Sequence, residues 1–156
     1  MDVQSDRRVV LFVTTLGAFI VPFMSSAINV ALPSIGKEFA MSTVILNWIA
    51  LSFSLTTAMF IFPLGRMGDI VGRKKVYLWG IAVFTFASAL CGISFNSGML
   101  IASRVLQGIS GAAISVTVVS ILTSVYPPGE RGRVLGLNVA MTYMGLSVGP
   151  FLGGIL

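Results

Sequence analysis

Arg104 is the residue best placed to do chemistry, because it stands alone in a long stretch of uncharged residues. A charge inside a membrane helix costs at least about 2.5–3.5 kcal/mol at the helix centre, so it usually faces protein or water and marks a functional site. Helical spacing gives it a polar, small face, made of Gln107, Gly108, Gly111 and Ser115. We expect this face to point into a helix bundle; the alternative is that Arg104 reaches the nearby extracellular end of its helix.

A second concentration of chemistry is the segment GRMGDIVGRKK at residues 65–75, which holds five of the chain's fifteen charged side chains. Its glycines permit sharp turns, and Asp69 precedes the next apolar stretch, where a helix dipole favours negative charge. Arg73 and Lys74 can pair with Asp69 or with anionic lipid headgroups. A phosphate-binding loop is excluded, because the segment lacks the Gly-Lys-Ser/Thr ending and follows no strand.

The third pattern is a set of small residues near the end of the sequence. Its spacing is Gly-x8-Gly-x3-Gly-Pro-x2-Gly-Gly, at Gly136, Gly145, Gly149, Pro150, Gly153 and Gly154. Three of these glycines recur at every fourth residue, and small side chains on one face allow helices to pack closely in lipid. Proline can also kink a helix. We expect a bent helix that packs tightly against a neighbour.

These residues lie in or beside five apolar stretches. The chain is 56% hydrophobic and only 10% charged, whereas a soluble domain has about 25% charged residues. No charged residue occurs in 9–36, 39–65, 76–103, 105–129 or 134–156, and a helix crosses a bilayer with roughly 20 apolar residues. The sequence predicts an all-α integral membrane protein with five spans, at about 9–32, 44–64, 76–95, 99–125 and 134–156.

The distribution of Lys and Arg predicts the orientation in the membrane. Eight of the ten lie in the N-terminal tail and in the segments that follow the second and fourth spans, whereas Lys37 alone lies at the opposite end. Basic loops tend to stay in the cytoplasm. We therefore expect a multi-pass protein of the plasma membrane with a cytoplasmic N-terminus.

The sequence argues against an enzyme. It has no histidine, Cys91 is its only cysteine, and its five acidic residues all fall in the predicted tail or loops. A histidine-based triad and most metal sites are thereby excluded, so we expect no catalytic residue, no metal and no cofactor. The net charge of +5 is explained by basic membrane loops rather than by nucleic-acid binding.

Together, these motifs resemble those of the major facilitator superfamily, and the resemblance covers nearly all 156 residues. The segment 65–75 is similar to the loop signature Gly-x-x-x-Asp-x-x-Gly-Arg-Lys/Arg, although Ile70 occupies a position that is often basic. The matching residues are Gly65, Asp69, Gly72, Arg73 and Lys74. The resemblance implies a cytoplasmic latch, whose charge contacts hold two helical bundles together in the outward-open state.

Two further motifs imply roles through the same resemblance. The segment RVLQGISGAA, which begins at Arg104, is similar to the fourth-helix motif, in which the arginine is associated with proton coupling and with hydrogen bonds to the first helix. The glycine pattern at 136–154 resembles that of the exporting antiporters. The implied activity is proton-coupled efflux of small, drug-like molecules.

The first span departs from the family pattern. The segment FMSSAINVALPSI resembles a first-helix motif of the drug:proton antiporters, particularly the fourteen-helix group, with matches at Asn29, Ala31, Leu32 and Pro33. The aspartate of that motif aligns with Met24, and no predicted span contains Asp or Glu. The proton carrier could lie in helices outside this chain, coupling could differ, or the protein could be an uncoupled facilitator. Asn29 could hydrogen-bond to the helix of Arg104.

The superfamily has twelve or fourteen helices, so we interpret the chain as an N-terminal fragment. Its expected partners are protons, a small-molecule substrate, membrane lipid and the missing C-terminal helices. Two alternatives remain: an importer or uncoupled facilitator with the same fold, and a truncated membrane protein that transports nothing.

Overall fold

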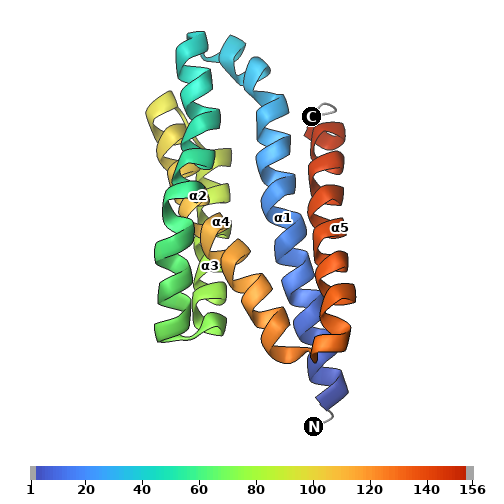
Figure 1. Cartoon of the computed structure of the whole chain (residues 1–156). Helices are drawn as coiled ribbons and strands as arrows, with labels where there is room; N and C mark the ends of the chain where they lie inside the picture. Colours follow the sequence, from blue (N-terminus) through green and yellow to red (C-terminus); the bar gives the residue numbers. More distant parts are fainter. Residues whose placement is uncertain (1–2, 154–156) are drawn as a thin grey trace.

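The computed structural model describes residues 3–153, and five helices account for nearly all of them (Figure 1). Each helix is long and apolar enough to cross a membrane, which confirms the predicted fold class. The helices are α1 (Val3–Glu38), α2 (Thr43–Val71), α3 (Arg73–Gly92), α4 (Ser97–Val125) and α5 (Pro128–Gly153).

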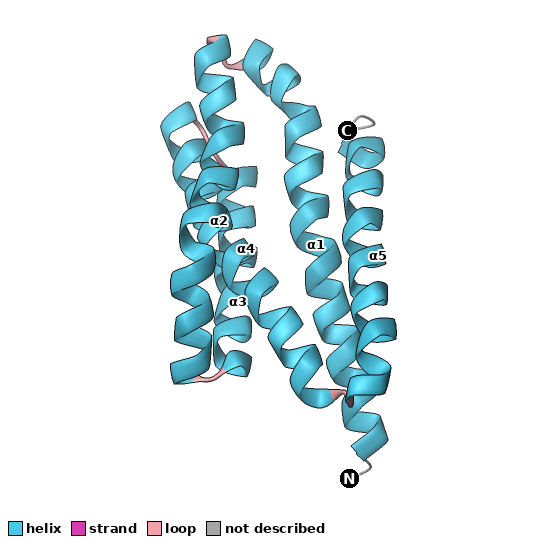
Figure 2. Ribbon diagram, in the orientation of Figure 1, coloured by secondary structure: helices cyan, strands magenta, loops and turns pink. Residues whose placement is uncertain are grey.

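The helices extend beyond the predicted spans. The first span was expected to end at Pro33, yet α1 continues through Pro22 and Pro33 to Glu38. Proline removes one backbone donor but leaves the other hydrogen bonds of a helix available, so a long apolar helix tolerates it. The connections are correspondingly short, as the loop colouring of Figure 2 shows.

The turn between α2 and α3 is shorter than its glycines suggest. Only Gly72 lies outside the two helices, with φ at +109°, a conformation that glycine adopts without strain. Gly65 and Gly68 lie inside α2 instead, and a Cβ on either would contact α4, at Val116 and Thr117 respectively. Their small size therefore serves helix packing rather than turning.

The five helices form two groups. In Figure 1, α1 runs beside α5, whereas α2 and α3 both pack along α4. The fourth helix is the most buried of the five, and it crosses α1 in the half of the molecule that contains the N-terminus. It therefore connects the two groups.

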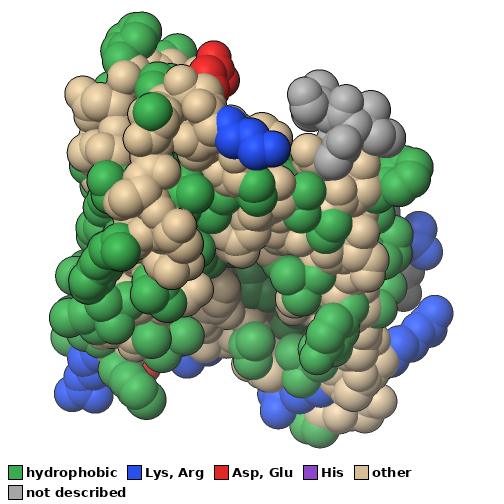
Figure 3. All heavy atoms as spheres, turned by 90° about the horizontal axis from the view of Figure 1, so that it is seen from above, with side chains coloured by type: hydrophobic (Ala, Val, Ile, Leu, Met, Phe, Trp, Pro, Cys, Tyr) green, Lys and Arg blue, Asp and Glu red, His purple; other side chains and the backbone are tan. Residues whose placement is uncertain are grey.

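The outer surface is apolar. Large hydrophobic side chains face outward from several helices, including Phe62, Trp79 and Phe95, which are between 71% and 84% exposed. Figure 3, which views the molecule from above, shows hydrophobic side chains around its outline. Water would disfavour so much exposed apolar area, whereas lipid does not. The surface therefore agrees with a membrane environment.

Candidate functional site

Arg104 points into the protein rather than toward the end of its helix. Only 1% of the residue is exposed, so the alternative that it reaches the extracellular interface does not hold in this structure. Its Nη1 donates to Gln107 Oε1 at 3.0 Å, and its Nε donates to the carbonyl oxygen of Ile49 on α2 at 3.4 Å. Its guanidinium carbon lies 4.5 Å from the centre of the Phe53 ring, within reach of a cation–π interaction.

Gln107 extends this contact to a third helix. Its Nε2 donates to Ser88 Oγ on α3 at 3.0 Å, while Ser88 donates to the carbonyl oxygen of Phe84 at 2.8 Å. We call the group Ile49, Ser88, Arg104 and Gln107 the arginine network. It joins α2, α3 and α4 through polar contacts in an apolar setting.

The small residues beside Arg104 serve a different purpose. A Cβ on Gly108 would lie 2.7 Å from the carbonyl oxygen of Phe53, so α2 and α4 can meet there only because the residue is glycine. A Cβ on Gly111 would lie 3.3 Å from Val21 Cγ1 of α1. Ser115, which was placed on the same buried face, is instead exposed. Ser115 is exposed because it lines a cavity between α1, α2, α4 and α5.

Asn29 could have hydrogen-bonded to the helix of Arg104, but its side chain forms no such bond among the described residues. Asn29 is exposed, and the interhelical hydrogen bond of Arg104 goes to α2 rather than to α1. Gly17 and Val21 of α1 meet α4 about two turns or more before Asn29 along the helix. In the turn after Asn29, it is Leu32 that joins a buried cluster with Ile49 and Leu100.

The charged segment forms a compact cluster at the end of the molecule that contains the N-terminus. Arg73 Nη2 and Nε lie 3.1 Å and 3.3 Å from Asp69 Oδ1, and Arg73 Nη1 donates to the carbonyl oxygen of Ser120 on α4 at 3.0 Å. Lys74 is exposed. Asp69 lies in the last turn of α2, not in a loop before α3. Arg73 thus fastens the α2–α3 connection to α4.

The glycine pattern of α5 divides into two parts. A Cβ on Gly145, Gly149 or Gly153 would collide with backbone carbonyl oxygens of α1, at Phe19, Phe23 and Ala27. Ser26 Oγ of α1 also donates to the carbonyl oxygen of Leu146 at 3.1 Å. We call this contact the α1–α5 seam.

Two other members of the pattern lie away from the seam. Gly136 has nothing within 4 Å of its ideal Cβ position, and Pro150 is exposed within α5. Gly154 lies outside the described residues. The seam therefore involves three of the five predicted positions that the structure describes.

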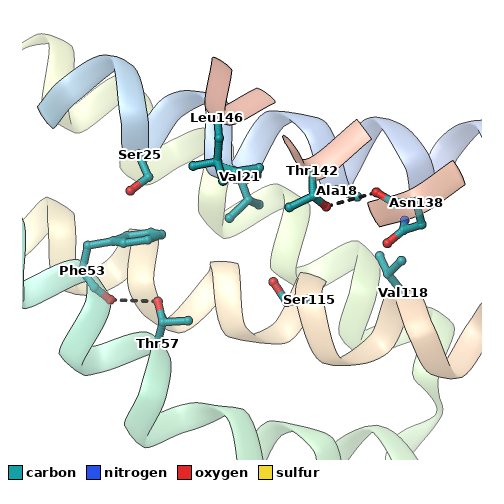
Figure 4. A pocket seen from close by; sticks show the side chains of 11 residues that line it. Ala18, Val21, Ser25, Phe53, Thr57, Ser115, Val118, Asn138, Thr142 and Leu146 are labelled. Atoms are coloured by element: carbon teal, nitrogen blue, oxygen red, sulfur yellow. Dashed lines mark hydrogen bonds between the residues drawn. The ribbon is translucent and has the colours of Figure 1, made fainter. Parts of the chain in front are cut away.

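A cavity of about 380 Å³ lies between α1, α2, α4 and α5 (Figure 4). We call it the central cavity, and no charged side chain lines it. Its walls combine apolar residues with uncharged polar ones: Ala18, Val21, Pro22, Ser25, Phe53, Thr57, Ser115, Val118, Asn138, Thr142 and Leu146.

The central cavity reaches the middle of the helices. Thr57 is the central residue of α2, which runs from Thr43 to Val71. Asn138 lies only four residues, about 6 Å along a helix, into the charge-free run of α5 that begins at residue 134. The cavity thus extends from the middle of the helices toward the end that contains the N-terminus.

Most of these polar residues do not stand out in the sequence, because they are neither ionisable nor motif positions: Ser25, Thr57, Asn138 and Thr142. Asn138 offered the clearest signal, because an amide inside an apolar span must find a hydrogen-bond partner or remain unsatisfied at a cost.

Comparisons with known proteins agree with the fold and the motifs. A family model described as "Major Facilitator Superfamily" matches residues 14–156. The chain is 36% identical over 147 residues to the multidrug resistance protein Stp of Mycobacterium tuberculosis, which covers 94% of this chain and 27% of that protein. It is 30% identical to the riboflavin transporter RibZ of Clostridioides difficile, with 98% of this chain and 34% of that protein covered.

A solved structure shows the same fold. It is a bacterial homolog of the human lysosomal transporter Spinster in an inward-facing, unoccupied conformation, with a TM-score of 0.87 and 24% identity. The alignment covers 96% of this chain and 32% of that one. The chain therefore spans about a third or less of the length of the proteins it matches.

Proposed function

The chain belongs to the Major Facilitator Superfamily, and on that premise we propose that it forms part of a secondary transporter. This transporter exports small, drug-like molecules in exchange for protons. The single observation that carries this proposal is the α1–α5 seam. Gly145, Gly149 and Gly153 hold α5 against the backbone of α1, in the pattern that resembles the exporting members. The name of the relative Stp, a multidrug resistance protein, supports the same direction.

The central cavity is the proposed substrate surface of this helix group. Transporter substrates bind near the bilayer midplane at the interface between repeats, and the cavity reaches the middle of the helices and has an opening between two helix groups. The helices of a second repeat would supply its other wall. The arginine network lies behind the wall that the described helices form. The ring of Phe53 stands between them, since it contacts Arg104 and also lines the cavity.

We propose that Arg104 acts in proton coupling by holding α2, α3 and α4 in a fixed arrangement, rather than by carrying the proton. Its described neighbours are a carbonyl, an amide and an aromatic ring. No carboxylate lies within the described part of the spans, so the proton carrier is proposed to belong to other helices. The cluster around Asp69 and Arg73 is the proposed latch on the cytoplasmic side.

The test is an efflux assay in a strain that lacks its own major exporters, with the protein expressed from its complete coding sequence. We expect lower accumulation of linezolid or chloramphenicol than in cells with an empty vector. A protonophore, which collapses the proton gradient, should abolish the difference. Unchanged accumulation of both compounds would contradict export, and efflux that survives the protonophore would contradict proton coupling.

The riboflavin transporter RibZ favours a second candidate, uptake of a solute. The same cells distinguish it, because an importer would speed the entry of labelled riboflavin while leaving the accumulation of both drugs unchanged.

A further inference from the structure

Asn138 carries a buried amide nitrogen, Nδ2, that hydrogen-bonds to no described residue. Only 8% of the residue is exposed. Asparagine in a membrane helix usually bonds to a neighbouring helix, and an unsatisfied buried amide costs about 1–3 kcal/mol. Asn138 therefore does not hold helices together in this structure, and its presence calls for another explanation.

The amide lies at the wall of the central cavity. Figure 4 shows it beside Val118 of α4 at one end of the cavity, with Ser115 farther along and Ser25 at the opposite end. Rotation of the amide about its last torsion exchanges the nitrogen and the oxygen, so it can offer the cavity either a donor or an acceptor.

The neighbouring hydroxyls divide into two kinds. Thr57 and Thr142 donate to backbone carbonyls, at 2.8 Å to Phe53 and 3.1 Å to Asn138. Ser25 and Ser115 form no hydrogen bond with another described residue, and neither is fully buried. Asn138 thus forms, with these two serines, a set of unpaired polar groups from three helices around one space.

The rest of the cavity restricts what can bind there. Its lining has no charged group, and Arg104 is separated from it by the Phe53 ring and its own burial. An ionised group moved from water into such a site loses hydration without gaining an opposite charge. Apolar side chains such as Val21 and Leu146 suit a largely hydrophobic molecule.

From this arrangement we infer that Asn138 is a specificity-determining residue, whose amide hydrogen-bonds an uncharged carbonyl or amide group on an otherwise apolar substrate. The inference rests on the proposed function, because it takes the central cavity as the substrate surface. It adds the substrate class and the residue that recognises it.

The experiment compares wild-type protein with Asn138→Leu, purified from the complete coding sequence, by thermal unfolding with and without ligand. The probes are chloramphenicol and linezolid, which are uncharged and carry amide-type carbonyls. Tetraphenylphosphonium, a cation without hydrogen-bonding groups, is the contrasting probe. Asn47→Leu is the matched control, because Asn47 is exposed near the start of α2 and does not line the cavity.

Two results are expected together. Without ligand, Asn138→Leu should unfold at a higher temperature than wild type, since leucine has a similar size and removes an unsatisfied amide. With chloramphenicol or linezolid, its Kd should be about 3- to 10-fold weaker, the loss of one hydrogen bond to an uncharged group. Tetraphenylphosphonium should behave alike in both proteins, and Asn47→Leu should match wild type throughout.

Several results would overturn the inference. A lower unfolding temperature for Asn138→Leu would show a structural role. An unchanged Kd for chloramphenicol and linezolid would show that the amide does not hydrogen-bond to them. The same conclusion follows if neither uncharged probe stabilises the wild-type protein. Binding that depends on Asn138 without any export would keep the inference and reject the proposed function. Export that is unaffected by Asn138→Leu would keep the proposed function and reject the inference.

Discussion

The buried charge of Arg104 is stabilised by three uncharged neighbours, two through hydrogen bonds and one through a cation–π contact. Hydrogen bonds to charged groups contribute about 1.5–3 kcal/mol each, and a cation–π contact contributes about 0.5–2 kcal/mol. Its Nη2 remains without a partner among the described residues. The stabilisation is thus divided among Gln107, Ile49 and Phe53, and loss of any one leaves the charge less well supported.

Removal of two members of the arginine network should therefore cost less than the sum of the two single removals. Gln107→Leu leaves Arg104 Nη1 unpaired, and we expect a loss of about 1–3 kcal/mol in the free energy of unfolding. Arg104→Met should cost a similar amount by stranding Gln107. The double variant should lose less than the sum, because a buried polar pair replaced by apolar groups is often nearly neutral.

Chemical unfolding in detergent measures this coupling. Ser110→Ala is the control, since the Ser110 hydroxyl bonds only to its own helix. Strict additivity of the two single substitutions would contradict the network.

At the scale of the helices, α5 is defined by where its glycines meet α1. The three seam glycines lie on one face because they recur every four residues, and each lies against a backbone carbonyl. Gly136 belongs to the same sequence pattern but has open space around it. The pattern alone cannot separate these two situations, because it contains no information about the position of the neighbouring helix.

Two alanine substitutions should thus have opposite effects. In Gly149→Ala the new Cβ would lie 2.8 Å from the carbonyl oxygen of Phe23, so the helices must separate, at a cost of about 1–3 kcal/mol. In Gly136→Ala nothing is displaced, and the higher helix propensity of alanine should stabilise the protein by up to about 1 kcal/mol. Thermal unfolding compares them directly, and equal destabilisation by both would show that the seam has been misplaced.

Much of the fold follows from the sequence because the bilayer imposes strong constraints. Charge-free runs fix the number of spans, and Arg104 had to turn inward because lipid solvates it poorly. The resemblance implied hydrogen bonds to the first helix, whereas the interhelical bond of Arg104 in this structure goes to α2; the sequence does not determine which helix lies beside the guanidinium. The central cavity was missed for a related reason: a hydroxyl such as that of Thr57 can satisfy itself on its own helix, so its type does not reveal what it faces.

At the scale of the whole molecule, charge and topology agree. The N-terminus, the α2–α3 connection and the α4–α5 connection lie at one end of the bundle (Figure 1), and eight of the ten basic residues belong to these segments or adjoin them. The opposite end carries the α1–α2 and α3–α4 connections. On the basis of the positive-inside rule, we propose that the basic end faces the cytoplasm.

Cysteine labelling tests this orientation in intact cells. In a Cys91→Ser background, Gly98→Cys at the start of α4 should react with a membrane-impermeant maleimide added outside. Lys74→Cys should react only after the cells are opened. Both positions are exposed, so access to the reagent decides the result. The reverse pattern would invert the proposed topology.

Phe53 belongs to two arrangements at once, since its ring covers Arg104 and also lines the central cavity. Most other cavity residues come from α1 and α5, away from the arginine network. Under the proposed export function, substitutions of these residues would change which compounds bind without disturbing the contacts of Arg104. A substitution of Phe53 would change both, so a new substrate preference acquired through this position should arise together with a second, compensating substitution.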